Sequence, residues 1–317
     1  MADVCLIIIF NHKYDKNLPK LEEIYRERFS DIYYLVPFYD GDMENVIPVY
    51  GRSIFFETYI AQGANIFFNP KYKHYLFIAD DMILRPSINE DNYKDYFEVE
   101  EGQSWIPALT PLQDMPKYWI GTMSAFTYRL KQKYVEAENE LLSEDEAISK
   151  MKYQGLNICP LNRYDLFKEW SFRTHYLADK FRLAARIITK VCRPFKKSYK
   201  LNYPLVGSYS DIVLVAQDDI KRFAHYCGVF GSTSLFVEVA IPTSLVLSAQ
   251  KKIKTEKDTK YKGRAYWQSP DVPFWEDSES HWDTIEQRYK NLDDMFNRFP
   301  DNQLYIHPVK LSKWAAK

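Results

Sequence analysis

Residues 75–84 read Tyr-Leu-Phe-Ile-Ala-Asp-Asp-Met-Ile-Leu, an apolar run that ends in two adjacent carboxylates. A run that is apolar on both faces is typical of a parallel strand with a covering layer on each side. Ligands of open α/β sheets bind at the carboxyl ends of such strands, so Asp80 and Asp81 are expected at the rim of a cleft. Neighbouring carboxylates repel each other unless a proton or a cation intervenes, and a divalent ion with oxygen ligands commonly does so. The alternative interpretation is structural, because Asp-Asp pairs are also common in turns and at helix starts.

The segments before this run predict strands and helices in alternation. Strands are expected over 4–10, 32–37 and 45–50, and helices over 18–29 and 53–68. A dinucleotide-binding fold would place a Gly-x-Gly-x-x-Gly turn after its first strand, whereas Asn11-His12-Lys13 contains no glycine. There is no Walker lysine loop either, so recognition of a diphosphate would need a metal ion.

Composition sets the outer limits. The 317 residues are 46% hydrophobic and 16% aromatic, enough for a large α/β core. Lysine and arginine number 42 against 43 acidic residues, so overall charge gives no indication of nucleic-acid binding. The four cysteines are scattered without metal-ligand spacing, which favours reduced thiols and a cytoplasmic location. No segment is long and apolar enough to cross a membrane.

The run from Phe77 to Leu84 resembles the metal-binding Asp-x-Asp-type segment of GT-A-fold glycosyltransferases. The resemblance implies a GT-A-like (Rossmann-like) α/β fold, with a mixed, mostly parallel sheet flanked by helices and a helical acceptor-side insertion. It also implies that Asp80 and Asp81 bind the Mn²⁺ or Mg²⁺ ion that bridges the diphosphate of a nucleotide sugar. From their positions at strand ends, Asn11 and Asp40 are expected to contact the nucleotide.

The segment from Tyr203 to Glu238 is similar to the second half of many GT-A enzymes. A strand, a helix that begins near Asp218-Asp219, and a Gly228-Val-Phe-Gly turn lead to an acid that serves as the catalytic base in that family. By this correspondence Glu238 is the candidate base and Asp211 the second candidate. Partial burial between two valines would raise the pKa of Glu238 toward a useful value. Family members more often have two adjacent acids here, whereas Val239 follows Glu238 in this chain.

The C-terminal sequence His307-Pro-Val-Lys310 resembles the element by which several GT-A enzymes supply a histidine to the metal and a lysine to the diphosphate. The resemblance implies one catalytic domain over 1–317. Its nucleotide-sugar half spans 1–112, a helical and partly basic insertion spans 113–200, and the acceptor half with the C-terminal element spans 201–317.

The implied activity is metal-dependent transfer of a hexose from a nucleoside-diphosphate sugar, most simply a UDP-sugar. The acceptor would be a glycan or a polyprenyl-pyrophosphate-linked glycan in bacterial surface-polysaccharide synthesis, such as O-antigen or capsule. Glu238 as base predicts inversion at the anomeric carbon, and a Glu238 that faces away from the sugar would favour retention.

Lysines and arginines alternate with apolar residues over 174–200. This pattern predicts either peripheral membrane contact through 180–200 or a helix with a core stripe and solvated lysines. Two rival functions remain open. One is a metal-dependent nucleotidyltransferase or phosphohydrolase, and the other is a non-catalytic protein that binds carbohydrate or a membrane surface.

Overall fold

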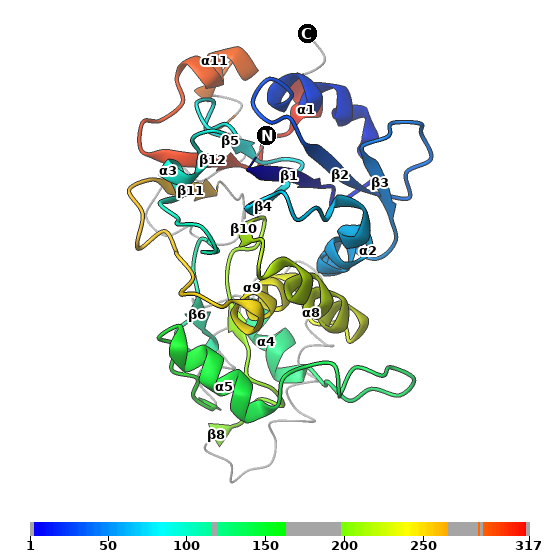
Figure 1. Cartoon of the computed structure of the whole chain (residues 1–317), viewed down its shortest axis with the longest axis vertical. Helices are drawn as coiled ribbons and strands as arrows, with labels where there is room; N and C mark the ends of the chain where they lie inside the picture. The colour runs from blue at the N-terminus through cyan, green and yellow to red at the C-terminus, as the bar shows by residue number, and fades with distance from the viewer. Residues whose placement is uncertain (1–2, 116–119, 163–197, 266–284, 286–287, 315–317) are drawn as a thin grey trace, which may run out of the picture.

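A computed structural model describes residues 3–115, 120–162, 198–265, 285 and 288–314 of the chain. Its centre is a five-stranded sheet in the order β10-β4-β1-β2-β3 (Figure 1). Four strands are parallel and β10 is antiparallel to β4. The predicted α/β class with a mixed, mostly parallel sheet is confirmed. The strands are β1 (Val4–Ile9), β2 (Ile32–Pro37), β3 (Val46–Val49), β4 (His74–Ala79) and β10 (Ile212–Ala216).

Helices cover both faces of this sheet because alternate side chains of each strand point to opposite sides. In β1, Leu6 and Ile8 belong to the core shared with α1, whereas Cys5 and Ile7 belong to the core shared with α2, α8 and α9. All six residues of β1 and of β4 are buried, which explains the continuous apolar runs. The helices are α1 (Leu18–Tyr25), α2 (Glu57–Phe67), α8 (Ile220–Ser232) and α9 (Val237–Ser248).

Two helices end or begin away from their predicted bounds. The helix predicted over 18–29 ends at Tyr25. The helix predicted over 53–68 starts with a separate 3₁₀ turn, η2 (Ser53–Phe55), and the Ser53 side chain caps neither element. Another 3₁₀ turn, η1 (Asp15–Asn17), precedes α1.

A small second sheet, in the order β11-β12-β5, lies beside the first. It comprises β5 (Ile83–Leu84), β11 (Lys262–Ala265) and β12 (Gln303–His307), with α3 (Tyr93–Phe97), α11 (Leu292–Asn297) and α12 (Leu311–Trp314) as further elements of this region. β12 is antiparallel to β5, which follows Asp80 and Asp81 directly. The terminal strand therefore lies next to the acidic pair. Residues 281–284 and 286–287, which precede α11, lie outside the described residues.

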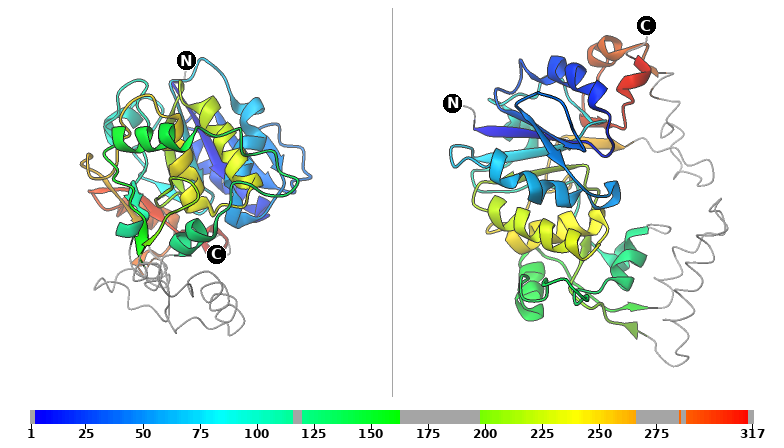
Figure 2. Two further views of the ribbon diagram at one scale, coloured as in Figure 1. Left: turned by 90° about the horizontal axis from the view of Figure 1, so that it is seen from below. Right: turned by 90° about the vertical axis from the view of Figure 1, so that its right-hand side faces the viewer.

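The remaining elements form the end of the molecule farthest from α1. The views in Figure 2 show α8 and α9 between the central sheet and α5. Ser143 caps the start of α5 through a capping box with Glu146. The elements are β6 (Thr110–Pro111), η3 (Leu112–Asp114), α4 (Ile120–Thr127), α5 (Glu144–Tyr153), β7 (Leu161–Asn162), β8 (Ser198–Tyr199) and β9 (Val206–Gly207).

The basic stretch 174–200 lies almost wholly outside the described residues, and the described Lys200 pairs with Glu144 at 2.5 Å. None of the helices in the described ranges combines the length and apolar character needed to cross a membrane.

One sequence prediction is wrong within this region. Gly228-Val-Phe-Gly231 was expected to form a turn, but it lies inside α8. The glycines are there because α8 packs closely on α2: a Cβ atom on Gly231 would lie 2.0 Å from Thr58 Cγ2, and one on Gly228 would lie 3.1 Å from Ala61 Cβ. The chain reverses two residues after the end of α8, where Ser234 has a left-handed φ of 59°.

Candidate active site

The strand order of the central sheet reverses between β1 and β4. From β1 the chain continues to β2 and β3 on one side, and α2 then brings it back to β4 on the other. Such a reversal of strand order is where ligands of open α/β sheets bind, at the carboxyl ends of the strands. Asn11 and Asp80 follow these two strands, and the Asn11 backbone N–H lies 3.5 Å from Asp80 Oδ1.

Asp80 is almost completely buried, with 4% of its surface exposed. Burial raises the pKa of Asp80 well above its usual range, and the neighbouring Asp81 carboxylate raises it further. The Asn11 N–H and His307 act in the opposite direction. A positive charge placed beside Asp80 would therefore favour its ionised form.

Asp81 contacts the other end of the chain. Its Oδ1 lies 2.9 Å from His307 Nε2, although the two residues are 226 positions apart. β12 ends at His307, and the Val309 N–H donates to the Asp81 carbonyl at 2.6 Å, which fixes this crossing. The side chain of His307 is 1% exposed and that of Asp81 is 31% exposed.

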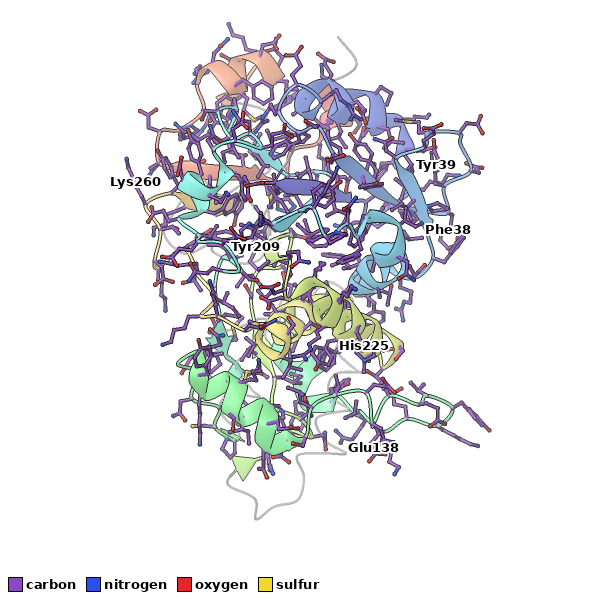
Figure 3. The ribbon with its side chains drawn as sticks, viewed as in Figure 1. Phe38, Tyr39, Glu138, Tyr209, His225 and Lys260 are labelled. Carbon is purple, nitrogen blue, oxygen red and sulfur yellow. The ribbon has the colours of Figure 1, made fainter. Side chains whose placement is uncertain are left out.

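Burial acts to lower the pKa of His307, but the carboxylates of Asp81, Asp211 and Asp80 outweigh it and the pKa is raised. Sequence reasoning missed a further partner of this imidazole. Tyr209, labelled in Figure 3, belongs to the connection between β9 and β10. Its hydroxyl group lies 2.6 Å from His307 Nδ1. No periodicity or motif indicates Tyr209, because only the tertiary fold brings it to β12.

Asp211 lies at the same edge of the sheet because β10 runs antiparallel to β4. Its carbonyl accepts from the Ala79 N–H at 2.9 Å, one residue before Asp80. Burial raises the pKa of Asp211; the charge of His307 lowers it, that of Asp81 raises it, and a hydrogen bond with Tyr209 lowers it. The four side chains of Asp81, His307, Tyr209 and Asp211 thus form one electrostatically coupled group.

Glu238 lies in the first turn of α9 and is half-buried. Its carbonyl accepts from the Ser208 N–H at 3.0 Å, and its charge contributes to raising the pKa of Tyr209 above its usual range, an effect dominated by burial. Glu238 therefore lies near this group, on the side of α9.

The two remaining predicted residues are at the surface. Asp40 follows β2, is 81% exposed and pairs with Lys13 at 2.8 Å. Lys310 is exposed and lies three residues after His307.

The side chains at this edge of the sheet are of the chemical kinds that bind a hard divalent ion. Carboxylates and an imidazole are ordinary ligands of Mn²⁺, and carboxylates and carbonyl oxygens are those of Mg²⁺. Asn11 Oδ1 is buried without a hydrogen-bond partner. Within the described residues, however, no three His, Cys, Asp or Glu side chains are grouped closely enough to hold an ion by themselves. Instead, the His307 imidazole and the Asp81 carboxylate form a hydrogen bond with each other.

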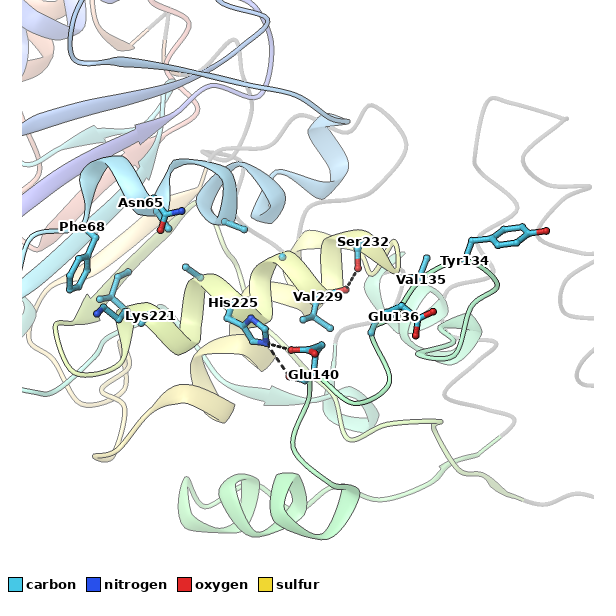
Figure 4. Close-up of a pocket in the computed structure, with 16 residues that line it drawn as sticks. Asn65, Phe68, Tyr134, Val135, Glu136, Glu140, Lys221, His225, Val229 and Ser232 are labelled. Atoms are coloured by element: carbon cyan, nitrogen blue, oxygen red, sulfur yellow. Dashed lines mark hydrogen bonds and ion pairs between the residues drawn. The ribbon is translucent and has the colours of Figure 1, made fainter.

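A cavity of about 940 Å³ lies elsewhere, between α2, α8 and the loop around 134–140 (Figure 4). A His225–Glu140 pair at 3.2 Å and the aromatic ring of Phe68 are among its lining groups. None of the predicted site residues lines it.

Comparison with known proteins adds little to this geometry. No protein family model matches the chain. Among solved structures, the chain is similar to the X-ray structure of the mannosyltransferase Ktr4p from S. cerevisiae in complex with GDP. The identity is 13% and the TM-score is 0.32, over 86% of this chain and 73% of that one. A similarity this low transfers neither substrate nor residue roles.

Proposed function

We propose that this chain is a metal-dependent glycosyltransferase that uses a nucleoside-diphosphate sugar as donor. The observation that carries the proposal is the 2.9 Å contact between Asp81 and His307 at the point where the strand order reverses. An acid pair at the end of one strand and a histidine at the end of another, on a sheet without a glycine-rich phosphate loop, suit recognition of a diphosphate through a cation.

In this proposal Asp80, Asp81 and His307 hold a divalent ion. The ion supplies positive charge that stabilises the departing diphosphate. Lys310, exposed just beyond His307, adds a second positive charge on the same side. Binding of the ion would remove the repulsion between Asp80 and Asp81, which raises the pKa of Asp80 in the protein alone.

The nucleoside would lie toward β2 and β3, where the carboxyl ends carry exposed aromatic rings. Phe38 and Tyr50 are 55% and 58% exposed, and their ring centroids are 5.5 Å apart. Phe38 has a left-handed φ of 54°, a conformation that is uncommon for an aromatic residue and is frequent at functional sites. Flat bases stack on such rings. Asn11 and Asp40 are proposed nucleotide contacts at the same edge.

Glu238 is the proposed general base that takes the proton from the acceptor hydroxyl, which implies inversion. Asp211, whose carboxyl group interacts electrostatically with His307 and Asp81, is the second candidate. Glu238→Gln should leave nucleotide-sugar binding unchanged while transfer falls about 100-fold or more. Calorimetry and transfer assays on the same preparation check this, with Glu136→Gln on an exposed loop as control. Full transfer activity in Glu238→Gln would exclude Glu238 as the base.

The experiment that tests the function measures release of UDP or GDP from a panel of sugar nucleotides, with and without Mn²⁺. We expect metal-dependent release that an acceptor glycan stimulates. Turnover without metal, or none with any donor, contradicts the proposal. The acceptor class, a glycan or lipid-linked glycan of surface-polysaccharide synthesis, rests on the resemblance of the motifs.

A metal-dependent phosphohydrolase or nucleotidyltransferase is the second candidate, because Asp211 provides a third carboxyl group close to the acidic pair. The products separate the two functions. Glycosyl transfer leaves a nucleoside diphosphate, whereas cleavage of the diphosphate leaves a nucleoside monophosphate and a sugar phosphate.

A further inference from the structure

We propose that Tyr209 is a positioning residue whose hydroxyl group fixes the orientation of His307 and determines which ring nitrogen is available to a cation. The part of this inference that concerns the cation rests on the proposed function. The part that concerns the hydrogen-bonding state of His307 in the metal-free protein does not.

The geometry holds Tyr209 firmly against the imidazole. Its hydroxyl group lies 2.6 Å from His307 Nδ1, and its ring meets the imidazole edge-on at a centroid distance of 5.7 Å. On its other side the ring stacks in parallel on Tyr305, with an interplanar angle of 6°. The Tyr305 hydroxyl donates to Glu256 Oε1, which also accepts from the Gly263 N–H. Tyr209 is therefore supported by a second buried layer.

Gly263 is required for this support. A Cβ atom at that position would lie 1.9 Å from the Tyr305 ring. The glycine leaves room for the stack of Tyr305 and Tyr209, and Ala265 of the same strand pairs with His307, so β11 contributes to the placement of His307 in two ways.

The chemistry of the partners decides where the hydrogens lie. An ionised carboxylate only accepts, so the 2.9 Å contact with Asp81 requires a hydrogen on His307 Nε2. In a neutral imidazole Nδ1 is then an acceptor, and the Tyr209 hydroxyl donates to it. A tyrosine hydroxyl can also accept, so the same contact survives if Nδ1 carries a hydrogen.

The ability of the Tyr209 hydroxyl both to donate and to accept a hydrogen bond would matter when a cation binds. A metal ion bound at Nε2 requires that nitrogen without a hydrogen, so the hydrogen of the neutral ring must be on Nδ1. Tyr209 would then accept from Nδ1 and could turn its own hydrogen toward Asp211, which lies within its hydrogen-bond reach. The ring loses one hydrogen at Nε2 and gains one at Nδ1, and its charge does not change. A phenylalanine at this position has no hydroxyl group, so it could neither donate to Nδ1 nor accept from it.

The test compares the wild type with Tyr209→Phe, which keeps the ring and its stacking. Nitrogen-15 NMR of the metal-free protein reports which nitrogen of His307 carries a hydrogen. The chain has six histidines, so the signal that disappears in His307→Asn identifies the right one. Calorimetry measures Mn²⁺ affinity, and Tyr203→Phe is the matched control because its buried hydroxyl donates to Leu142 O instead.

We expect hydrogen on Nε2 in the wild type and a mixture of hydrogen positions in Tyr209→Phe. The Mn²⁺ affinity of Tyr209→Phe should fall about 10- to 100-fold, as it does when outer partners of metal-bound histidines are removed. Tyr203→Phe should match the wild type in both measurements.

Two results would overturn the inference. One is a wild-type spectrum with Nε2 bare in the absence of metal, a measurement that needs no variant. The other is a folded Tyr209→Phe with unchanged spectrum and affinity. A wild type that binds neither Mn²⁺ nor Mg²⁺ contradicts the proposed function instead, and the metal-free spectra still decide the role of Tyr209.

Discussion

At the scale of single residues, the two adjacent aspartates occupy different environments. Asp80 is buried at the end of β4, whereas the Asp81 side chain is 31% exposed and meets His307. The backbone reversal after β4 explains the difference, since it turns Asp80 into the sheet and Asp81 toward β12. Asp81 is therefore the member of the pair that is more accessible from solvent.

Replacing Asp81 by alanine should abolish metal-dependent donor binding, with an affinity loss of about 100-fold or more, because the removed carboxylate is a proposed ion ligand and the partner of His307. Titration calorimetry with a nucleotide sugar and Mn²⁺ measures this. Asp42→Ala, an exposed acid in the loop after β2, should bind as the wild type does. Unchanged metal-dependent binding in Asp81→Ala would exclude Asp81 as a ligand.

Glu57 is a second buried acid, in the first turn of α2, and neither of its carboxylate oxygens has a hydrogen-bond partner. Burial raises the pKa of Glu57 well above its usual value of 4.5. A carboxyl group that binds its proton more tightly in the folded protein costs stability as the pH rises above the unfolded value, by up to about 1.4 kcal/mol for each pH unit.

Glu57→Gln removes this pH dependence. Relative to the wild type, the variant should gain stability between pH 5 and pH 8, with the smallest difference near pH 4. Thermal unfolding across this range measures the effect, with Glu136→Gln as an exposed control that should show no such trend. A constant difference at all pH values would mean that Glu57 does not hold its proton.

At the scale of elements, the contact between α2 and α8 shows that glycines can occur in a chain for two different structural reasons. Glycines in Gly228-Val-Phe-Gly231 suggest a turn from sequence, but here they allow two helices to approach closely. A local rule cannot distinguish these cases, because the partner that needs the space is about 170 residues earlier in the chain.

Gly231→Ala should destabilise the protein by about 1–3 kcal/mol, because the added methyl group meets Thr58 Cγ2 at 2.0 Å. In a helix without such a neighbour the same change would be stabilising, so the sign of the effect tests the packing. Denaturant-induced unfolding measures it. Ser232→Ala, the next residue on the exposed side of α8, serves as control, and a stabilised Gly231→Ala would show that the helices are farther apart.

At the scale of the whole molecule, the site depends on the second sheet, which brings the C-terminal strand β12 beside β5 and the acidic pair. Arg85 follows β5 and links it to the start of β12: its guanidinium donates to the carbonyls of Pro300 and Gln303 at 2.8 and 3.2 Å. It also lies 5.4 Å from the centre of the Tyr261 ring. These contacts place β12, and therefore His307, against β5.

Arg85→Ala should lower stability by about 1–3 kcal/mol, since it leaves buried carbonyls without their charged donor. Amide hydrogen exchange in β12 should become faster, and Mn²⁺ affinity should fall although Arg85 is not a proposed ligand. Arg26→Ala, which removes an exposed ion pair with Glu22, is the control. Faster exchange confined to other strands would show that Arg85 does not hold β12.

Sequence by itself determined the central architecture. The bounds of β2 coincide with the predicted strand, and those of β1, β3 and β4 differ from prediction by a residue or two, because strands buried on both faces leave an unbroken apolar signature. The acidic pair was visible for the same reason, as an abrupt change from apolar to charged residues. These are local signals, and a single sequence contains them in full.

The resemblance of the motifs implied that His307 and the two aspartates share a site, but only the tertiary structure decided which of their atoms meet and which other residues join them. His307 and Asp81 are joined by the antiparallel pairing of β12 with β5, Tyr209 enters through the connection before β10, and Gly231 is fixed by its neighbour on α2. Each of these depends on pairing or packing between segments far apart in the chain. The free energy of such contacts comes from the assembled fold, so no pattern within either segment alone can report it.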